Sequence, residues 1–361
     1  MTHWPDRRIP DLFGIELPII QAPLAGATTV DMVVATAKAG GLGSLPSALL
    51  DVDELRQALN HIRTSTNAPV NVNFFSHRSP PADLEAQKRW EAMLSPYYAE
   101  YGLDSGAPVT GVGRAPFDGT FCEVVEEFRP EVVSFHFGLP ANELVQRVKA
   151  TGARIIASAT TVAEAIWLEA HGVDAVIAMG FEAGGHRGNF LTQDMATQVG
   201  TMALVPQVVD AVRVPVIAAG GISDGRGVAA ALMLGASAVQ VGTAYLFCPE
   251  ARIHPVHAKA LAAAGDDSTA ITNLFTGRPA RSVVNRLMRD LGPISDSVPS
   301  FPTAGAALAP IRARAEAASR NDFTNLWSGQ AARLAPRTGA EELTRELYRT
   351  ALEIIGRLNP T

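Results

Sequence analysis

The sequence predicts an α/β fold, a (β/α)8 TIM barrel with a helical C-terminal appendage and an insertion after the third strand. Short apolar runs alternate with longer amphipathic stretches up to about residue 250, which gives eight strand–helix units. Strands that alternate with helices form parallel sheets. The runs are too apolar for strands with one solvated face. Burial on both sides therefore favours a closed barrel, with an open doubly wound sheet as the alternative.

The first three strand–helix units are recognised by the residues that begin and end their helices and by the composition of their strands. Residues 15–24 form the first strand, and the helix at 29–39 ends at a Gly-Gly pair that stops helices. After a short second strand at 42–46, the helix at 51–64 opens with Asp51 and Glu54 at the spacing of a capping box. Residues 69–75, PVNVNFF, are rich in β-branched and aromatic side chains and form the third strand.

The later units repeat this rhythm after an insertion. The insertion covers residues from about 76 to 120, with a charged helix at 82–94, and a further helix follows at 121–128. The remaining strands are predicted at 132–137, 154–159, 175–179, 215–219 and 238–242. The remaining helices are predicted at 141–151, 161–172, 204–212 and 225–235.

The rhythm ends near residue 250, which divides the chain into two parts. Residues 1–250 are predicted to form the barrel together with its insertion. Residues 251–361 are rich in Ala and Arg and are interrupted by Pro293, Pro299 and Pro302. They are predicted as the last barrel helix plus a helical appendage over the barrel mouth.

Composition excludes several classes of protein. Of the 361 residues, 47% are hydrophobic and 18% charged, which excludes a disordered or collagen-like chain. A net charge of −6 without a long Lys/Arg run predicts no nucleic-acid partner. No apolar stretch approaches the roughly 20 residues that span a bilayer, and the N-terminus has no signal-peptide pattern. The two cysteines form no disulfide framework, so a reducing, cytoplasmic location is expected.

Glycines at two neighbouring strand ends predict a phosphate site. Gly220 and Gly221 follow the seventh predicted strand, and Gly242 and Thr243 follow the eighth. Missing side chains let backbone N–H groups approach an anion, and loops seven and eight of a barrel, helped by a helix N-terminus, converge on one phosphate. The alternative is that these glycines only make tight turns.

The loop from Glu182 to Gly188 is the sharpest single feature. Gly184 and Gly185 precede His186 at the barrel mouth, where a flat loop can lie against a planar cofactor and present an imidazole. A neutral imidazole can take a proton from a carbon acid. The alternative is a surface histidine in a flexible loop.

Polar residues within apolar strands are candidates for contacts with the ring of a cofactor. Asn73 and Gln240 can match the edge of a heteroaromatic ring, or they belong to polar ladders in the core. His136 is either a core residue or a contact with substrate. His254 and His257 are expected on an exposed helix, and no metal site is predicted. A phosphate site, ring contacts and one base together suggest an FMN enzyme, because flavin supplies redox chemistry that side chains lack.

Several motifs together resemble the nitronate monooxygenases, also called 2-nitropropane dioxygenases. The motifs are QAPLAG at 21–26, NFF at 73–75, SFHFG at 134–138, EAGGHRG at 182–188, AGGI at 219–222, QVGT at 240–243, FTGRPAR at 275–281 and WSGQ at 327–330. The resemblance implies a barrel with non-covalent FMN that oxidises alkyl nitronates with O2 by electron transfer to the flavin. His186 matches the catalytic position, which manages the proton next to the nitro group, and His136 matches a histidine of the substrate pocket.

Cofactor contacts follow from the same motifs and from the strand ends. The positions that match flavin contacts in the family are Asn73, Gly184, Gly221, Gln240, Val241, Gly242 and Thr243. The further strand-end positions predicted to contact the cofactor are Ala22, Pro23, Met179, Gly185 and Gly220. We expect a small-molecule substrate and O2 as partners, and a monomer or homodimer.

Two departures from the family pattern concern the substrate. Met179 stands where the family usually has Gln, so a hydrogen bond near the flavin is missing. Phe301, Gly305 and Ala309 stand where the best-known class has two tyrosines and a lysine, which predicts a larger or less anionic substrate. The main alternative is an NAD(P)H-dependent flavin reductase of the enoyl-thioester or quinone type. A catalytically silent flavin- or phosphate-binding barrel and a non-flavin barrel such as a phosphosugar isomerase are further alternatives.

Overall fold

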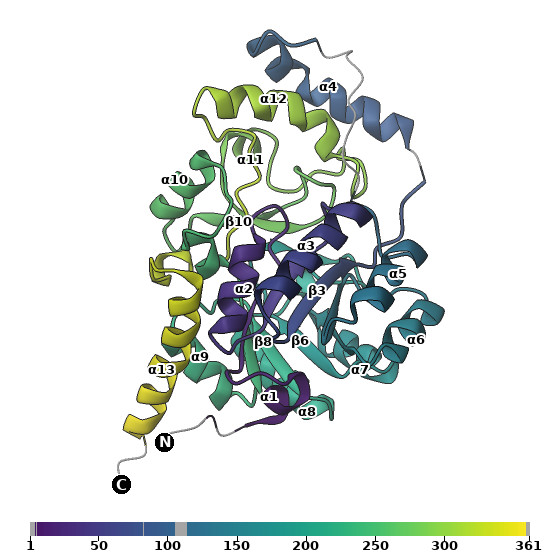
Figure 1. Cartoon of the computed structure of the whole chain (residues 1–361). Helices are drawn as coiled ribbons and strands as arrows, with labels where there is room; N and C mark the ends of the chain where they lie inside the picture. Colours follow the sequence, from purple (N-terminus) through teal and green to yellow (C-terminus); the bar gives the residue numbers. More distant parts are fainter. Residues whose placement is uncertain (1–3, 5, 82, 105–113, 359–361) are drawn as a thin grey trace.

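Eight parallel strands form the central sheet of the computed structural model, which describes residues 4, 6–81, 83–104 and 114–358. The strand order is β1-β9-β8-β6-β5-β4-β3-β2. The two ends of this sheet meet, because Gln21 N donates to Leu42 O at 3.0 Å and Leu42 N donates to Ile19 O at 2.9 Å. The closed (β/α)8 barrel is therefore confirmed over the open sheet (Figure 1).

The barrel elements lie where the apolar rhythm predicts them. The strands are β1 (Ile19–Gln21), β2 (Gly43–Pro46), β3 (Val70–Phe75), β4 (Val132–His136), β5 (Arg154–Ala159), β6 (Ala175–Met179), β8 (Val216–Ala219) and β9 (Ala238–Val241). The helices are α2 (Val30–Lys38), α3 (Val52–Ser65), α5 (Gly119–Phe128), α6 (Asn142–Ala150), α7 (Val162–Ala170), α8 (Thr201–Ala211) and α9 (Gly225–Met233). The capping box of α3 is present, with Glu54 N donating to Asp51 Oδ1 at 2.8 Å.

Two boundaries differ from the prediction for identifiable reasons. β1 is much shorter than residues 15–24, because Pro18 and Pro23 flank it and proline has no N–H for a ladder. α8 begins at Thr201 instead of residue 204. The carboxylate of Glu182, distant in sequence, accepts the Thr201 N–H at 2.8 Å and so caps this helix from outside.

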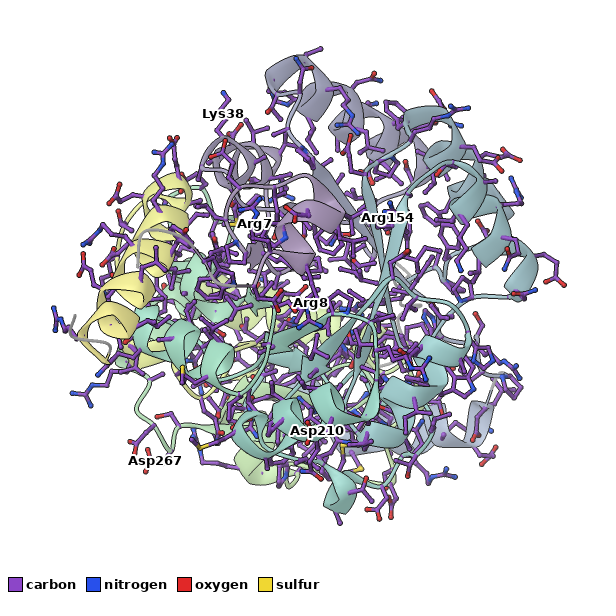
Figure 2. The ribbon with its side chains drawn as sticks, turned by 90° about the horizontal axis from the view of Figure 1, so that it is seen from below. Arg7, Arg8, Lys38, Arg154, Asp210 and Asp267 are labelled. Atoms are coloured by element: carbon purple, nitrogen blue, oxygen red, sulfur yellow. The ribbon has the colours of Figure 1, made fainter. Side chains whose placement is uncertain are left out.

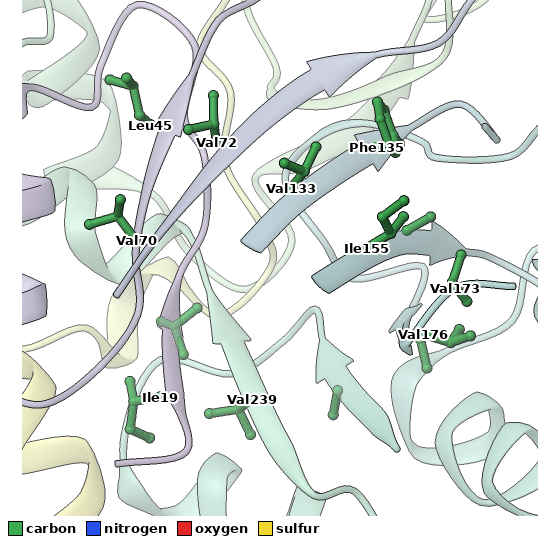
Figure 3. Packing of buried hydrophobic residues seen from close by; sticks show 14 of the residues in the cluster. Ile19, Leu45, Val70, Val72, Val133, Phe135, Ile155, Val173, Val176 and Val239 are labelled. Atoms are coloured by element: carbon green, nitrogen blue, oxygen red, sulfur yellow. The ribbon is translucent and has the colours of Figure 1, made fainter. Parts of the chain in front are cut away.

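Apolar side chains between the strands and the surrounding helices make the main core. Ile19, Leu45, Val72, Val133 and Ile155 belong to this layer, and Figure 3 shows them on successive strands. Alternate strand residues point the other way, into the barrel. This two-sided burial is what the nearly continuous apolar runs require.

A short helix that the sequence analysis missed closes the bottom of the barrel. In α1 (Arg8–Phe13), Ile9 and Phe13 are buried against Ile20, Ile156 and other residues of the barrel interior. Figure 2, seen from below, places Arg7 and Arg8 near the middle of the molecule. Six residues with an internal proline are too few to show helical periodicity, so only the open end of the barrel defines this helix.

The region after β9 combines helices with a small antiparallel sheet. The elements are η2 (Thr243–Phe247), α10 (Pro255–Ala263), β10 (Thr269–Thr272), β11 (Ala280–Val283), α11 (Arg286–Asp290), α12 (Gly305–Ala317), η3 (Ala332–Leu334) and α13 (Ala340–Leu358). β7 (Gly185–His186) joins this sheet in the order β10-β11-β7. The predicted helical appendage is present as α10 to α13, but it also contains this small sheet, which the sequence did not reveal because the edge partner of the hairpin lies about 95 residues earlier in the chain.

The outer helices of this region take two different positions. α13 packs against α9 and α2, which is the place of the eighth barrel helix (Figure 1). α12 lies beside α4 (Leu84–Glu100), the helix of the insertion, above the barrel mouth. α4 runs beyond the predicted 82–94, while residues 82 and 105–113 of the predicted insertion are outside the described residues. Within the described ranges, no helix has the length and apolarity to cross a bilayer.

Replacing Ile9 by Ala tests the closure by α1. The free energy of unfolding, measured by urea denaturation, should fall by about 2–5 kcal/mol, because a cavity opens at a fully buried position. Arg7→Ala on the same helix removes only an exposed ion pair with Asp11 and should cost less than about 1 kcal/mol. Equal effects of the two substitutions would show that α1 is not part of the core.

Candidate functional site

The strand ends open into a cavity of about 1270 Å³ at the barrel mouth. Most predicted site residues line it, namely Ala22, Pro23, Asn73, His136, Met179, Gly184, Gly185, His186, Gly220, Gly221, Gln240, Gly242 and Thr243. Val241 does not, because its side chain is buried in the core between strands and helices. The structure therefore brings together the loops that the sequence analysis selected, with only the backbone of Val241 near the site.

The loop that carries His186 is held rigidly. Gly185 and His186 pair as β7 with Arg281 and Ala280 of β11. The fully buried Arg187 donates to the carbonyl oxygens of Gly180 at 2.7 Å and of Met179 at 2.9 Å. The barrel holds one side of the loop and the C-terminal hairpin holds the other. These contacts argue against a surface histidine in a flexible loop.

A second pair of contacts fixes the start of the same loop. The Glu182 carboxylate accepts hydrogen bonds from the N–H of Thr201 and from its hydroxyl at 2.9 Å. Arg281 donates to Phe181 O at 2.9 Å and its guanidinium lies 4.8 Å from the Phe181 ring centre. Glu182 and Arg187 of this segment therefore support the loop. His186 is the ionisable residue of the segment that has no such supporting role.

The two positions before His186 require glycine for different structural reasons. A Cβ on Gly184 would lie 2.4 Å from Gly329 N, so this glycine lets the segment around Ser328 approach. A Cβ on Gly185 would meet nothing within 4 Å, but its φ of +71° is a left-handed conformation that glycine favours. Only Gly185 leaves space on the cavity side of the loop.

The hydroxyl of Thr276 defines the protonation of the His186 ring. His186 Nε2 lies 2.9 Å from Thr276 Oγ1, and Thr276 Oγ1 donates weakly to Arg278 O at 3.4 Å. A hydroxyl that donates to a carbonyl is free to accept from the ring, which favours the tautomer with the hydrogen on Nε2. Nδ1 then has an unshared lone pair, and within the described chain no group bonds to it. Thr276 lies in the FTGRPAR motif but was not selected from the sequence.

Burial keeps the His186 ring neutral. Burial lowers the pKa of His186 well below 6.5, and the nearby cations Arg114 and Arg278 lower it further. Burial also lowers the pKa of His136 to about 3. Both rings are therefore neutral at physiological pH, and the free Nδ1 of His186 can accept a proton.

His136 lines the cavity, and both of its ring nitrogens bond within the protein. Its Nδ1 lies 2.9 Å from Ser158 Oγ, and its Nε2–H donates to His186 O at 3.2 Å. Both ring nitrogens are used inside the protein, so His136 has no free nitrogen to offer a substrate. In this structure it positions the backbone of His186.

Aromatic rings surround His186. The ring centres of Phe301 and Trp327 lie 5.4 Å and 5.3 Å from the imidazole centre. Phe137 lies 6.0 Å away and has a φ of +74°, which is unusual for a bulky residue. Such strain is common at functional sites. Phe301 is buried in this cluster, whereas Gly305 and Ala309 line the cavity.

Arg114 is a cation at the cavity that the sequence analysis missed. It lines the cavity, and its guanidinium lies 5.9 Å from the Phe301 ring centre. Within the described ranges no carboxylate pairs with it. Burial lowers its pKa, and the charge of Arg312 lowers it further. A partly buried cation without a counter-ion is costly, so this position fits an anionic ligand.

The cofactor side of the cavity has unused hydrogen-bonding groups. Gln240 Oε1 is buried without a partner in the described chain, although Gln21 on the adjacent strand is fully satisfied through Ser44 N and Thr28 Oγ1. Asn73 uses its amide N–H on Ser134. Buried amides are normally paired, so the orphaned oxygen of Gln240 fits a ring that donates a hydrogen bond.

The loops after β8 and β9 fit a phosphate through their backbone. In the described chain, the N–H groups of Gly221, Gly242 and Thr243 donate to no protein atom. The helix N-terminus nearby is not free, because Asp224 caps α9 by accepting from Arg226 N at 2.9 Å. The expectation that this helix end assists is therefore not supported, and loop N–H groups remain as the donors.

His254 is exposed at the start of α10, close to the expectation, whereas His257 differs from it. His257 is buried and donates from Nε2 to Trp327 O at 3.1 Å, so it is not on an exposed face. His254 accepts the N–H of Val256 as the N-cap of α10. In the part of the chain that the structure describes, no three His, Cys, Asp or Glu residues lie together as a metal site.

Comparisons with known proteins agree with this geometry. A family model described as nitronate monooxygenase matches residues 7–350. A nitronate monooxygenase of Paraburkholderia phytofirmans is 40% identical over 355 residues, 98% of this chain and 97% of that protein. The structure of a nitroalkane oxidase from Streptomyces ansochromogenes matches with a TM-score of 0.88 and 36% identity, over 98% of this chain and 100% of the other. FabK from Thermotoga maritima matches with a TM-score of 0.73 and 29% identity, over 97% of each chain.

Replacing Thr276 by Val tests the assignment of the ring proton. In ¹⁵N NMR of labelled protein, His186 should carry its hydrogen on Nε2 in the native chain and in Thr276→Ser. Thr276→Val should populate the Nδ1–H form up to about tenfold more, because it removes a hydrogen bond of about 0.5–1.5 kcal/mol. An Nδ1-protonated ring in the native chain would contradict the assignment.

Proposed function

The chain belongs to the nitronate monooxygenase family, and on this premise we propose that it is an FMN-dependent enzyme that oxidises alkyl nitronates with O2. The observation that carries the proposal is that a neutral His186 and the cation Arg114, which has no carboxylate partner in the described chain, line one cavity. A base beside a cation suits a carbon acid whose conjugate base is an anion.

The residues at the cavity fit FMN. Gln240 and Asn73 would hold the edge of the ring system, and the N–H groups of Gly221, Gly242 and Thr243 would hold the phosphate. Gly185 leaves room for the face of the ring. When bound, FMN supplies the redox chemistry by accepting electrons from the substrate and passing them to O2. The cavity volume exceeds the usual range of about 300–1,000 Å³ for one ligand, which allows cofactor and substrate together.

The protein residues manage the proton and the charge. When the neutral nitroalkane enters the site, His186 Nδ1 takes the proton from the carbon next to the nitro group and so forms the nitronate, while Thr276 holds Nε2–H in place. Arg114 stabilises the negative charge that the nitro group then carries. His136 and Arg187 hold the loop, so the imidazole does not turn away during the proton transfer.

Anaerobic absorbance spectroscopy of the purified protein tests this function. The protein should show a flavin spectrum that bleaches on addition of propyl-2-nitronate and regains its colour with O2. A parallel cuvette with NADH should keep its colour. Bleaching by NADH and not by nitronate would instead support a flavin reductase. A colourless protein that binds no FMN would contradict both functions.

The His186→Asn variant separates the base from the fold. With neutral nitroalkane as substrate, kcat/KM should fall by about 10²–10⁴, the usual contribution of a general base. With preformed nitronate the loss should be smaller, because the proton is already gone. Since the pKa of His186 lies well below 6.5, the acid limb of the native pH profile should also lie below pH 6.5. His171→Asn, at an exposed histidine, is the matched control.

Met179→Gln tests the departure at the cofactor site. Met179 lines the cavity, and a Gln of similar size would restore a hydrogen bond of about 0.5–1.5 kcal/mol. The Kd for FMN, measured by fluorescence quenching, should fall by about 2- to 10-fold. Met233→Gln on the exposed face of α9 should leave the Kd unchanged. An unchanged Kd in Met179→Gln would show that position 179 does not face the flavin.

A further inference from the structure

The cavity continues beyond the base into a space between α4 and α12. We call this space the outer arm and define it by Gln87, Trp90 and Glu91 on α4 and Gly305, Ala309 and Arg312 on α12, all of which line the cavity. None of these residues belongs to the strand ends that fit the cofactor. The outer arm is therefore available to the substrate.

One face of α4 and one face of α12 form the outer arm. Residues 305, 309 and 312 are four and three positions apart, so they lie on one face of α12, and residues 87, 90 and 91 lie on one face of α4. The two helices are held at a fixed separation. Trp90 Nε1–H donates to Ala304 O at 3.1 Å, and the Tyr98 hydroxyl donates to Ala307 O at 2.7 Å.

The small residues of α12 keep the outer arm open. Gly305 has no side chain, and a Cβ there would meet only Phe275 O, at 3.0 Å. Ala309 contributes a single methyl group on the same face. Larger residues at these two positions would project into the space between the helices. The size of Gly305 and Ala309 thus decides how far a ligand extends from the base.

An apolar path connects His186 to the outer arm. The imidazole centre lies 5.3 Å from Trp327, and the Trp327 ring lies 5.6 Å from Phe275. Phe275 O in turn approaches Gly305. Polar groups stand at the far end, where Arg312 donates to Asn325 Oδ1 at 3.1 Å and Gln87 is exposed. The aromatic and small residues along this path suit a hydrocarbon chain.

We propose that the substrate is a primary alkyl nitronate with an extended hydrocarbon chain, which runs from His186 over Trp327 and Phe275 into the outer arm. This inference rests on the proposed function and names its substrate class. Arg114 holds the anionic head near the base, and the outer arm receives the tail. Each methylene buried along this path adds binding energy in proportion to its apolar area.

A chain-length series tests the proposal with the FMN-loaded enzyme. The kcat/KM for ethyl-, butyl-, hexyl- and octyl-1-nitronate should rise by up to about fourfold per added methylene until the chain fills the outer arm. Ala309→Leu should lower kcat/KM for octyl nitronate at least tenfold and leave ethyl nitronate within about twofold. Ala313→Leu, the same change on the exposed face of α12, should leave the whole series unchanged. Ala309→Val, a smaller change, gives the same test if the Leu variant does not fold.

Binding of carboxylates gives a readout that does not depend on turnover. Butanoate, hexanoate and octanoate carry a planar anionic head like a nitronate, and their Kd values follow from the perturbed flavin spectrum. The Kd should fall with chain length in the native enzyme and not in Ala309→Leu. A flat series for both nitronates and carboxylates, or an equal loss for all chain lengths in Ala309→Leu, would overturn the proposal. Oxidation of no nitronate together with chain-dependent carboxylate binding would overturn the nitronate function instead, with the outer arm retained.

Discussion

The site depends on one structural constraint, the pairing of the His186 loop with the C-terminal hairpin. The β7–β11 ladder fixes the backbone of His186, and Thr276 next to that hairpin fixes its ring. On the other side, Arg187 ties the loop to the end of β6 through two carbonyl oxygens. His186 is therefore held between barrel and appendage, and residues of both parts line the cavity.

The arginines at the barrel mouth differ in whether the protein satisfies their charge. Arg187 and Arg281 are buried, but backbone carbonyl oxygens accept their N–H groups and satisfy them. Arg114 lines the cavity and has no carboxylate partner in the described chain. The neighbouring His136 is neutral and adds no charge, because burial lowers its pKa to about 3. The cavity at the mouth therefore carries a positive charge that no carboxylate of the described chain balances.

Periodicity made most of the fold predictable. Apolar strand runs and the Asp51–Glu54 capping box are local signals, so the barrel elements were found within a few residues, β1 excepted. The motifs around His186 and Gln240 were also visible, because glycine and polar residues at strand ends are unusual in apolar surroundings. By contrast, α1 and the β10–β11 hairpin carry little local signal, since each is defined by a partner far away in the chain.

The sequence by itself determined the barrel and placed the glycine-rich loops and His186 at its mouth, because these depend on residue types at fixed spacing along the chain. Only the tertiary structure decided the roles. It showed His136 supporting the loop through both ring nitrogens, Thr276 directing the proton of His186 and Arg114 entering the cavity from the insertion. It also showed that Gly305 and Ala309 open a space between two helices. Hydrogen-bond partners and cavities arise from segments distant in sequence, so no local pattern specifies them.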